Sequence, residues 1–206
     1  MRTTDAPSPA TPRADVHAET IEGFGALRFT PVDPAADSAV LHSWVSEERA
    51  KFWGMNGVSR ELVQEIYEDV DRRTTHHAFM VRLDGEPVAL FQTYQPEEDR
   101  VSECYEVREG DIGIHLMLAP ADGRPRPGFS RTLVGALIRF TFLDPAVRRA
   151  VAEPDAANQK ALALLGRIGF AAQGEITLPE IDLPEVYLPE KRAVLAFLDR
   201  PASLSA

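Results

Sequence analysis

The sequence predicts a mixed α/β fold in which helices cover both faces of one sheet, and three observations support this prediction. Stretches with apolar residues at every second position alternate with stretches that have apolar residues at helical spacing. Their order is strand, two helices, three strands, helix, strand, helix and two strands, which is typical of a sheet packed between helices. The 206 residues, 44% hydrophobic and 26% charged, suffice for one domain with a substantial core.

The two ends of the chain are expected to lie outside this domain. The first 24 residues are rich in proline, alanine and threonine, so we expect a disordered tail over 1–24. The domain is then expected over 25–200, followed by a short C-terminal tail over 201–206. The chain contains no stretch of eighteen apolar residues, which argues against a membrane span.

The first half of the domain is predicted to contain a strand, two helices and a hairpin. The segment GALRFTP predicts the strand, and Asp33 then caps a helix that has Pro34 at its first position. Ser59 caps the second helix. The segments HAFMVRL and PVALFQTY are joined by Asp84-Gly85, a two-residue turn that hairpins favour.

The strand predicted over 111–118 has two chemically different faces. One face comprises Ile112, Ile114, Leu116 and Leu118, and the other comprises Asp111, Gly113, His115 and Met117. The aliphatic face is expected to pack into a core, so the acid, the glycine and the histidine are directed elsewhere. His115 has two interpretations, a functional side chain or a strand histidine that is satisfied by a cross-strand partner.

A basic turn follows this strand and leads into a helix predicted over 130–143. Within 119–131, three arginines (Arg124, Arg126 and Arg131) outnumber one aspartate, a net +2 in a chain of −10. Gly128 allows a ligand to approach the backbone, and a helix N-terminus presents N–H groups and partial positive charge to phosphate. The turn therefore predicts a phosphate site, and a solvated turn is the alternative.

The last part of the domain is predicted to contain a strand, a helix and two strands. Pro154 ends the strand RRAVAE, and Asp155 opens the helix, which Gly169 terminates. Helix capping explains Asp155 completely, yet capping is compatible with catalysis at the same sheet edge. Between the closing strands FAAQGEI and EKRAVLAFL, Leu-Pro-Glu recurs three times, and its prolines predict an exposed extended loop.

Charge and cysteine content exclude several classes of protein. Lys and Arg number 22 against 32 Asp and Glu, which argues against nucleic acid or an anionic membrane as partner and suits a small cationic substrate. The single cysteine, Cys104, excludes an internal disulfide and fits a reducing compartment, so we expect a cytoplasmic protein. The five histidines are not spaced as ligands, and no metal site is predicted.

Several of these segments together resemble a known family. The element order β-α-α-β-β-β-α-β-α-β-β, the strand-loop-helix unit over 111–143 and the segment NQKALALLGRIGF at Asn158 to Phe170 resemble the GNAT acyl-CoA N-acyltransferase fold. More closely, GDIGIHL and VAEPDAAN, preceded by Trp44 and Phe52-Trp53, are similar to the acyltransferases of hydroxamate siderophore assembly, of the aerobactin, mycobactin and desferrioxamine types. The resemblance covers residues 25–198.

The resemblance implies an acyl-CoA donor that lies between the strand at 111–119 and the strand at 148–153. Its pantetheine would pair with the backbone of Leu116, Met117 and Leu118 as an added strand does. The residues expected to bind the rest of the donor are Arg126, Gly128, Phe129, Ser130, Arg131, Thr132 and Asn158. This chain departs from the family in the turn, where Pro125 replaces arginine or glutamine and Ser130 replaces glycine or alanine.

The resemblance also implies roles at the acceptor. His115 would hold the hydroxyl or amine of the acceptor, and Asp155 would take the proton as the nitrogen attacks the thioester. Trp53, Asp111 and Gly113 are expected to line the same site, Gly113 by leaving room for the acyl chain.

These observations together predict an enzyme that transfers an acetyl or succinyl group from acyl-CoA to an N-hydroxylated diamine or an ω-N-hydroxyamino acid. It would work beside other enzymes of siderophore assembly. One alternative is acetylation of another polycationic amine, such as an aminoglycoside. Another is a catalytically silent module that binds acyl-CoA.

Overall fold

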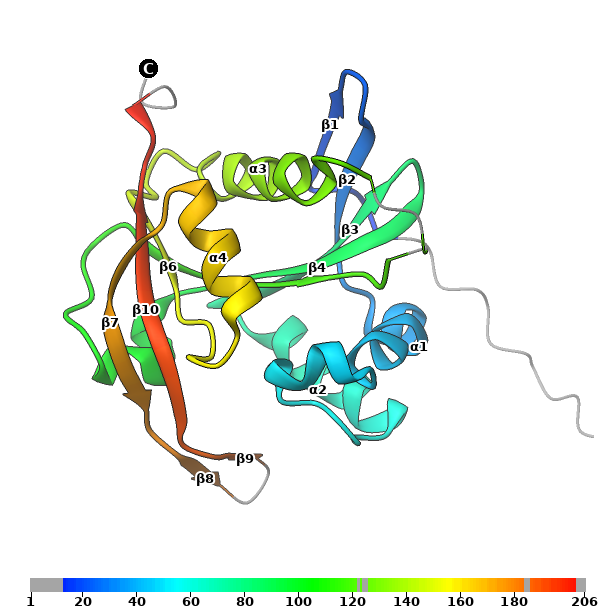
Figure 1. The fold of residues 1–206 in the computed structure, drawn as a ribbon. Coiled ribbons are helices and arrows are strands. Elements are labelled where there is room, and N and C mark those ends of the chain that lie inside the picture. The colour runs from blue at the N-terminus through cyan, green and yellow to red at the C-terminus, as the bar shows by residue number, and fades with distance from the viewer. Residues whose placement is uncertain (1–12, 122, 124–125, 184–185, 203–206) are drawn as a thin grey trace, which may run out of the picture.

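A computed structural model describes residues 13–121, 123, 126–183 and 186–202 of the chain (Figure 1). Its main feature is an eight-stranded sheet with the order β1-β2-β3-β4-β5-β6-β10-β7. These strands are β1 (His17–Ile21), β2 (Gly25–Pro31), β3 (His76–Leu83), β4 (Glu86–Tyr94), β5 (Asp111–Leu118), β6 (Arg149–Ala152), β7 (Ala171–Leu178) and β10 (Lys191–Asp199). Neighbours are antiparallel except β5 and β6, which are parallel. The predicted mixed α/β fold is confirmed.

Helices cover both faces of the sheet, as predicted. The helices are α1 (Pro34–Val45), α2 (Arg60–Arg72), α3 (Phe129–Thr141) and α4 (Gln159–Ile168), with short 3-10 helices η1 (Glu48–Trp53), η2 (Pro96–Glu98) and η3 (Arg100–Glu103). The aliphatic face of β5 packs in one core with residues of α3 and α4. Met117, on the opposite face, packs in a second core with α1 and α2. In Figure 1, α3 lies above the strands and α1 and α2 lie below them.

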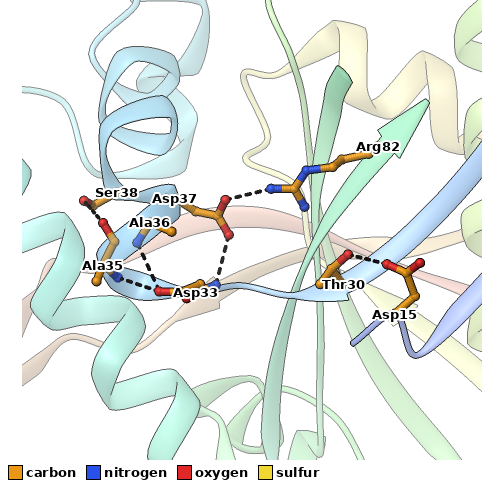
Figure 2. Close-up of polar contacts among 8 residues, drawn as sticks. All are labelled: Asp15, Thr30, Asp33, Ala35, Ala36, Asp37, Ser38 and Arg82. Carbon is orange, nitrogen blue, oxygen red and sulfur yellow. Dashed lines mark hydrogen bonds and ion pairs between the residues drawn. The ribbon is translucent and has the colours of Figure 1, made fainter. Parts of the chain in front are cut away.

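A buried carboxylate attaches the start of α1 to β3 (Figure 2). Asp33 caps the helix as predicted, since its carboxylate accepts the N–H groups of Ala35 and Ala36. Asp37 is 6% exposed and accepts the Asp33 N–H and an Arg82 N–H, each at 2.9 Å. A buried carboxylate with two donors resists displacement, so α1 is fixed over one face of the sheet.

Two predicted segments differ from the structure. The tail expected over 1–24 does not reach residue 24, because residues 17–21 form β1, which pairs with β2 along its whole length. Residues 1–12 lie outside the described part of the chain. The Leu-Pro-Glu segment was expected to be an extended loop, but it forms a hairpin of β8 (Ile181–Leu183) and β9 (Val186–Leu188) that pairs outside the main sheet. Pro179 and Pro189 flank the paired residues and therefore do not interrupt this ladder.

None of the helices in the described part of the chain is long and apolar enough to cross a membrane.

Candidate functional site

The candidate site forms where β5 and β6 separate. The two strands pair only from Asp111 to Gly113 of β5, opposite Arg149 to Val151 of β6, whereas β5 continues to Leu118. The N–H of Ala119 donates to the carbonyl oxygen of Val88 in β4. Because hydrogen-bonding directions alternate along a strand, the backbone groups of Leu116 and Leu118 face the open edge. Amide groups of a ligand can pair with such an edge.

A cation already contacts this edge. Arg49 of η1 donates Nη1–H to the carbonyl oxygen of Leu118 at 2.6 Å and Nε–H to Glu47 at 2.7 Å. The α1–α2 connection therefore reaches the strand at the point where a ligand would pair with it.

Beside the open edge, His115 forms an ion pair with a buried glutamate. Nε2 of His115 lies 2.5 Å from Oε1 of Glu153, and the Tyr94 hydroxyl donates to Oε2 of Glu153 at 2.8 Å. The Glu153 side chain is 4% exposed and that of His115 is 38% exposed. The carboxylate is therefore enclosed, while the imidazole remains accessible to a ligand.

The two partners shift each other's pKa in opposite directions. Burial opposes the charge on His115, but the charge and hydrogen bond of Glu153 outweigh burial and raise the pKa of His115. Burial likewise opposes the charge on Glu153, yet His115, Lys191 and Tyr94 together lower the pKa of Glu153. Since Glu153 is ionised, Nε2 of His115 carries the hydrogen and donates it, which leaves Nδ1 as the free nitrogen of neutral imidazole.

The ring of Trp53 lies beside that of His115. The two ring centroids lie 6.2 Å apart in an edge-to-face arrangement. The indole N–H of Trp53 is hydrogen-bonded to the buried hydroxyl of Tyr67 in α2. The Trp53 ring is therefore held in place from the core. Trp44, in contrast, is 4% exposed and belongs to that core.

Three residues expected at the ligands have structural roles instead. Asp111, whose side chain is 1% exposed, pairs with Arg149 through both oxygens, so it does not reach the acceptor. The space over Gly113 holds the ring of Tyr94 rather than an acyl chain. Met117 is 6% exposed in the core and its backbone faces β4, so it does not present groups to a donor.

The predicted phosphate turn begins α3. Gly128 is the N-cap residue with φ of 80°. The N–H groups of Phe129 and Thr132 are bonded to Arg126 and Gly128, so these two do not serve a phosphate. The N–H groups of Ser130 and Arg131 have no partner within the described residues, and free N–H groups at a helix start suit an anion.

A cavity of about 290 Å³ adjoins this turn. Arg126, Gly128, Phe129 and Thr132 line one side, and Ile21 to Phe24 of the β1–β2 turn line the other. Arg124 lies outside the described residues.

Asp155 and Asn158 follow β6 and shape the start of α4. The cap of α4 is Asn158, whose side chain accepts the N–H of Ala161, and not Asp155 as expected. This bond explains the asparagine at position 158 without any contact to acyl-CoA. Asp155 accepts the N–H of Ala157 at 2.8 Å, and its backbone bridges to Ala193 of β10. In the described residues no hydrogen bond joins Asp155 to His115.

Sequence reasoning did not identify Tyr94 and Glu153 as site residues. The alternation of side chains along a strand could have indicated Glu153. Gly113 pairs with Val151, and His115 and Glu153 each lie two residues further along their segments. The same face then carries both side chains. The register of β5 against β6 was needed to see this.

The described residues contain no group of three or more His, Cys, Asp or Glu side chains that could hold a metal ion.

Comparison with known proteins points to one family. Residues 33–178 match the model described as "Acetyltransferase (GNAT) domain". The chain is 28% identical over 149 residues to the aminoglycoside N(6')-acetyltransferase type 1 of Klebsiella pneumoniae, covering 70% of this chain and 74% of that protein. It is 24% identical over 145 residues to the N-hydroxyputrescine acetyltransferase of Acinetobacter baumannii, covering 70% and 68%.

Solved structures share the fold. A structure of AAC(6')-Ib in complex with paromomycin and acetyl-CoA has a TM-score of 0.69 at 26% identity, covering 84% of this chain and 93% of that one. An uncharacterised protein from Bacillus halodurans has a TM-score of 0.72 at 22% identity, covering 90% and 92%.

Proposed function

Because this chain belongs to the GNAT acetyltransferase family and is an acyl-CoA-dependent N-acyltransferase, we propose that its acceptor is an N-hydroxylated diamine or ω-N-hydroxyamino acid. Acceptors of the hydroxycadaverine, hydroxylysine and hydroxyornithine type fit, and the product would be a hydroxamate for siderophore assembly. The observation that carries the proposal is the His115–Glu153 pair beside the open edge of β5. Enzymes that hydroxylate the amine and that consume the hydroxamate would be its pathway partners.

We place the acyl-CoA donor along the open edge of β5 and at the turn that begins α3. An acetyl-CoA or succinyl-CoA would pair its pantetheine amides with Leu116 and Leu118. Its phosphates would meet the N–H groups of Ser130 and Arg131 and the charge of Arg126.

The acceptor half of the proposal uses His115. As the acceptor nitrogen attacks the thioester carbonyl, a C–N bond forms, the C–S bond breaks and the nitrogen loses a proton. Nδ1 of His115 can take this proton, because the Nε2–H is fixed on Glu153, and can return it to the departing thiolate. Asp155 remains the other candidate for the proton, as the resemblance implies.

An N-hydroxylated amine suits such a base. A hydroxylamine nitrogen is neutral near pH 7 and is already nucleophilic, so a single imidazole has one proton to remove during attack. An aliphatic ammonium group must also lose a proton before it can attack. The relatives include an N-hydroxyputrescine acetyltransferase and a lysine N-acyltransferase, MbtK, of a Mycobacterium species, at 24% identity each.

The second candidate function is acetylation of an aminoglycoside. It is favoured by the 28% identity to an aminoglycoside acetyltransferase and by the shared fold of AAC(6')-Ib. The chain's net charge of −10 suits both kinds of cationic acceptor. The silent module is not retained, since membership of this enzyme family makes the chain an acyltransferase.

A matrix of donors and acceptors tests the proposal. Acetyl-CoA and succinyl-CoA are each incubated with N-hydroxycadaverine, N-hydroxylysine, N-hydroxyornithine, unhydroxylated lysine and an aminoglycoside. We expect thiol release and a ferric hydroxamate colour with at least one hydroxylamine, at a kcat/KM that exceeds its unhydroxylated counterpart by about tenfold or more. Turnover of the aminoglycoside with none of the hydroxylamines would overturn the proposal and support the second candidate.

A further inference from the structure

Tyr94 crosses one strand to reach the next. It pairs with Gly113 of β5, yet its hydroxyl donates to Glu153, beyond the end of β6. A Cβ on residue 113 would lie 2.0 Å from Cζ of the Tyr94 ring. The phenol therefore lies directly on the backbone of Gly113, and any larger residue there would block its path.

The Tyr94 hydroxyl completes the shell of a buried anion. Glu153 accepts from Tyr94 on one oxygen and from His115 on the other, and it is 4% exposed. When the His115 imidazolium gives up a proton, Glu153 loses the positive charge beside it and remains a buried anion. At that moment the Tyr94 hydrogen bond matters most, because a donor stabilises the bare anion more than the neutral ion pair.

We propose that Tyr94 is a positioning residue that acts through Glu153 to keep His115 in its proton-accepting form, and that residue 113 is glycine so that the phenol can reach Glu153. The catalytic consequence rests on the proposed function. The titration of His115 does not, because it follows from the contacts within the free protein.

Other charged and titratable groups also face the His115–Glu153 pair. Lys191 of β10 donates to the carbonyl oxygen of Glu153 at 3.3 Å and opposes protonation of His115. Asp99, between η2 and η3, favours that protonation. The ring of His76 in β3 stacks on that of Tyr94, with centroids 5.8 Å apart, and burial lowers the pKa of His76. Each of these groups is unchanged in the variants below.

The two partners of Glu153 predict opposite shifts. Tyr94→Phe keeps the ring over Gly113 but removes the donor, so the deprotonated state loses stability and the pKa of His115 rises by about one unit. Glu153→Gln removes the anion itself, so the pKa of His115 falls. A role of Tyr94 in packing alone would produce neither the rise nor this contrast.

The experiment is an NMR titration of histidine-labelled protein without substrates, with His115 assigned from a His115→Gln variant. Tyr105→Phe is the matched control, because Tyr105 donates to a different carboxylate, that of Asp111, at 3.1 Å. We expect His115 to titrate unchanged in Tyr105→Phe, higher in Tyr94→Phe and lower in Glu153→Gln. In active protein, the acidic limb of the kcat/KM profile moves by the same amounts.

Two results would overturn the inference. One is a Tyr94→Phe titration that matches Tyr105→Phe, and the other is a shift of Tyr94→Phe in the direction of Glu153→Gln. Gly113→Ala adds a check, since its shift should not add to that of Tyr94→Phe in a double-mutant cycle. If that variant does not fold, the two tyrosine variants and Glu153→Gln still decide. If the titration behaves as expected while no hydroxylamine is acylated, the proposed function alone fails.

Discussion

At the scale of single residues, the reactivity of His115 is set by a carboxylate 38 positions later in the chain. Glu153 raises the pKa of His115, so the proton-accepting form becomes dominant only as pH rises through that raised value. Activity should therefore increase with pH over the titration of His115.

Two substitutions separate the candidate bases at this scale. His115→Gln should lower kcat by about 10²–10⁴-fold, the usual contribution of a general base, and leave the KM for acyl-CoA nearly unchanged. Asp155→Asn should keep most of its turnover, because an asparagine oxygen can still accept the N–H of Ala157. Steady-state kinetics of both variants, with melting temperatures beside them, provide the measurement.

The reverse result has a clear meaning. If Asp155→Asn loses the larger factor while its melting temperature is unchanged, the proton goes to Asp155 and His115 holds the acceptor. That outcome would leave the acceptor class of the proposed function intact and would reassign its base.

The sequence predicts that His115 and Trp53 share a site, and their rings do lie close together, but it did not anticipate the structural roles of the neighbouring Asp111 and Gly113. Alternation along 111–118 correctly separated an aliphatic face from a polar one. It could not show that Asp111 would be used by Arg149, or that Gly113 makes room for Tyr94. Both facts depend on how β4 and β6 are aligned with β5, which local residue patterns do not encode.

At the scale of elements, the start of α3 is the feature that sequence composition predicted most directly. Reversing Arg126 and Arg131 to glutamate should raise the KM for acyl-CoA and leave the KM for the acceptor almost unchanged. The reason is that two positive charges beside the N–H groups of Ser130 and Arg131 become negative. Initial-rate kinetics against each substrate measure the two constants.

Each single arginine reversal is compared with a control that makes the same change of charge, which distinguishes a local effect from a change in net charge. Arg167→Glu alters an exposed arginine in the last turn of α4 and should leave both constants unchanged. Acyl-dephospho-CoA extends the test, because a donor without the ribose phosphate should be less sensitive to the arginine reversals if an arginine binds that phosphate. If the wild type and the double variant bind acyl-CoA equally well, the turn is not a phosphate site and its arginines only face solvent.

Most helices and central strands followed from caps, turns and periodicity. Asp33, Ser59 and the Asp84-Gly85 turn occur as predicted, with φ of 51° and 92° in the turn. β1 was missed because HAETI has only two apolar residues, Ala18 and Ile21, which do not alternate with polar ones, so the segment reads as part of a polar tail. Its edge position explains this composition, since an edge strand is half exposed to water.

At the scale of the whole molecule, the sheet consists of two parts that meet along a short seam. β1 to β5 form one part and β6, β10 and β7 form the other, and the seam is the three-residue pairing of β5 with β6. The Asp111–Arg149 ion pair lies at the closed end of the seam, and the guanidinium also lies 4.0 Å from the centroid of Phe197 on β10. The opening proposed for the donor is therefore a property of strand order and not of any loop.

The β1–β2 turn lines the cavity at the proposed phosphate site, and two truncations test whether this segment contributes to donor binding. Removal of residues 1–12 should change neither the melting temperature nor kinetics, since β1 and its contacts remain. Removal of residues 1–24 takes away five paired strand residues and the packing of Ile21 on the core under α3, so the melting temperature should fall by on the order of 5 °C. The same deletion removes Glu22 to Phe24, one wall of the 290 Å³ cavity at the α3 turn, so the KM for acyl-CoA should rise. Calorimetry and donor kinetics on the two truncated proteins measure these effects.

The surface ion pairs of this segment, such as Glu19 with Arg139, contribute little, because exposed pairs are worth only about 0–1 kcal/mol. Glu19→Gln is therefore the control that should behave like the wild type. If the longer deletion is as stable as the shorter one, β1 is dispensable and the folded domain begins at β2, as the sequence alone predicts.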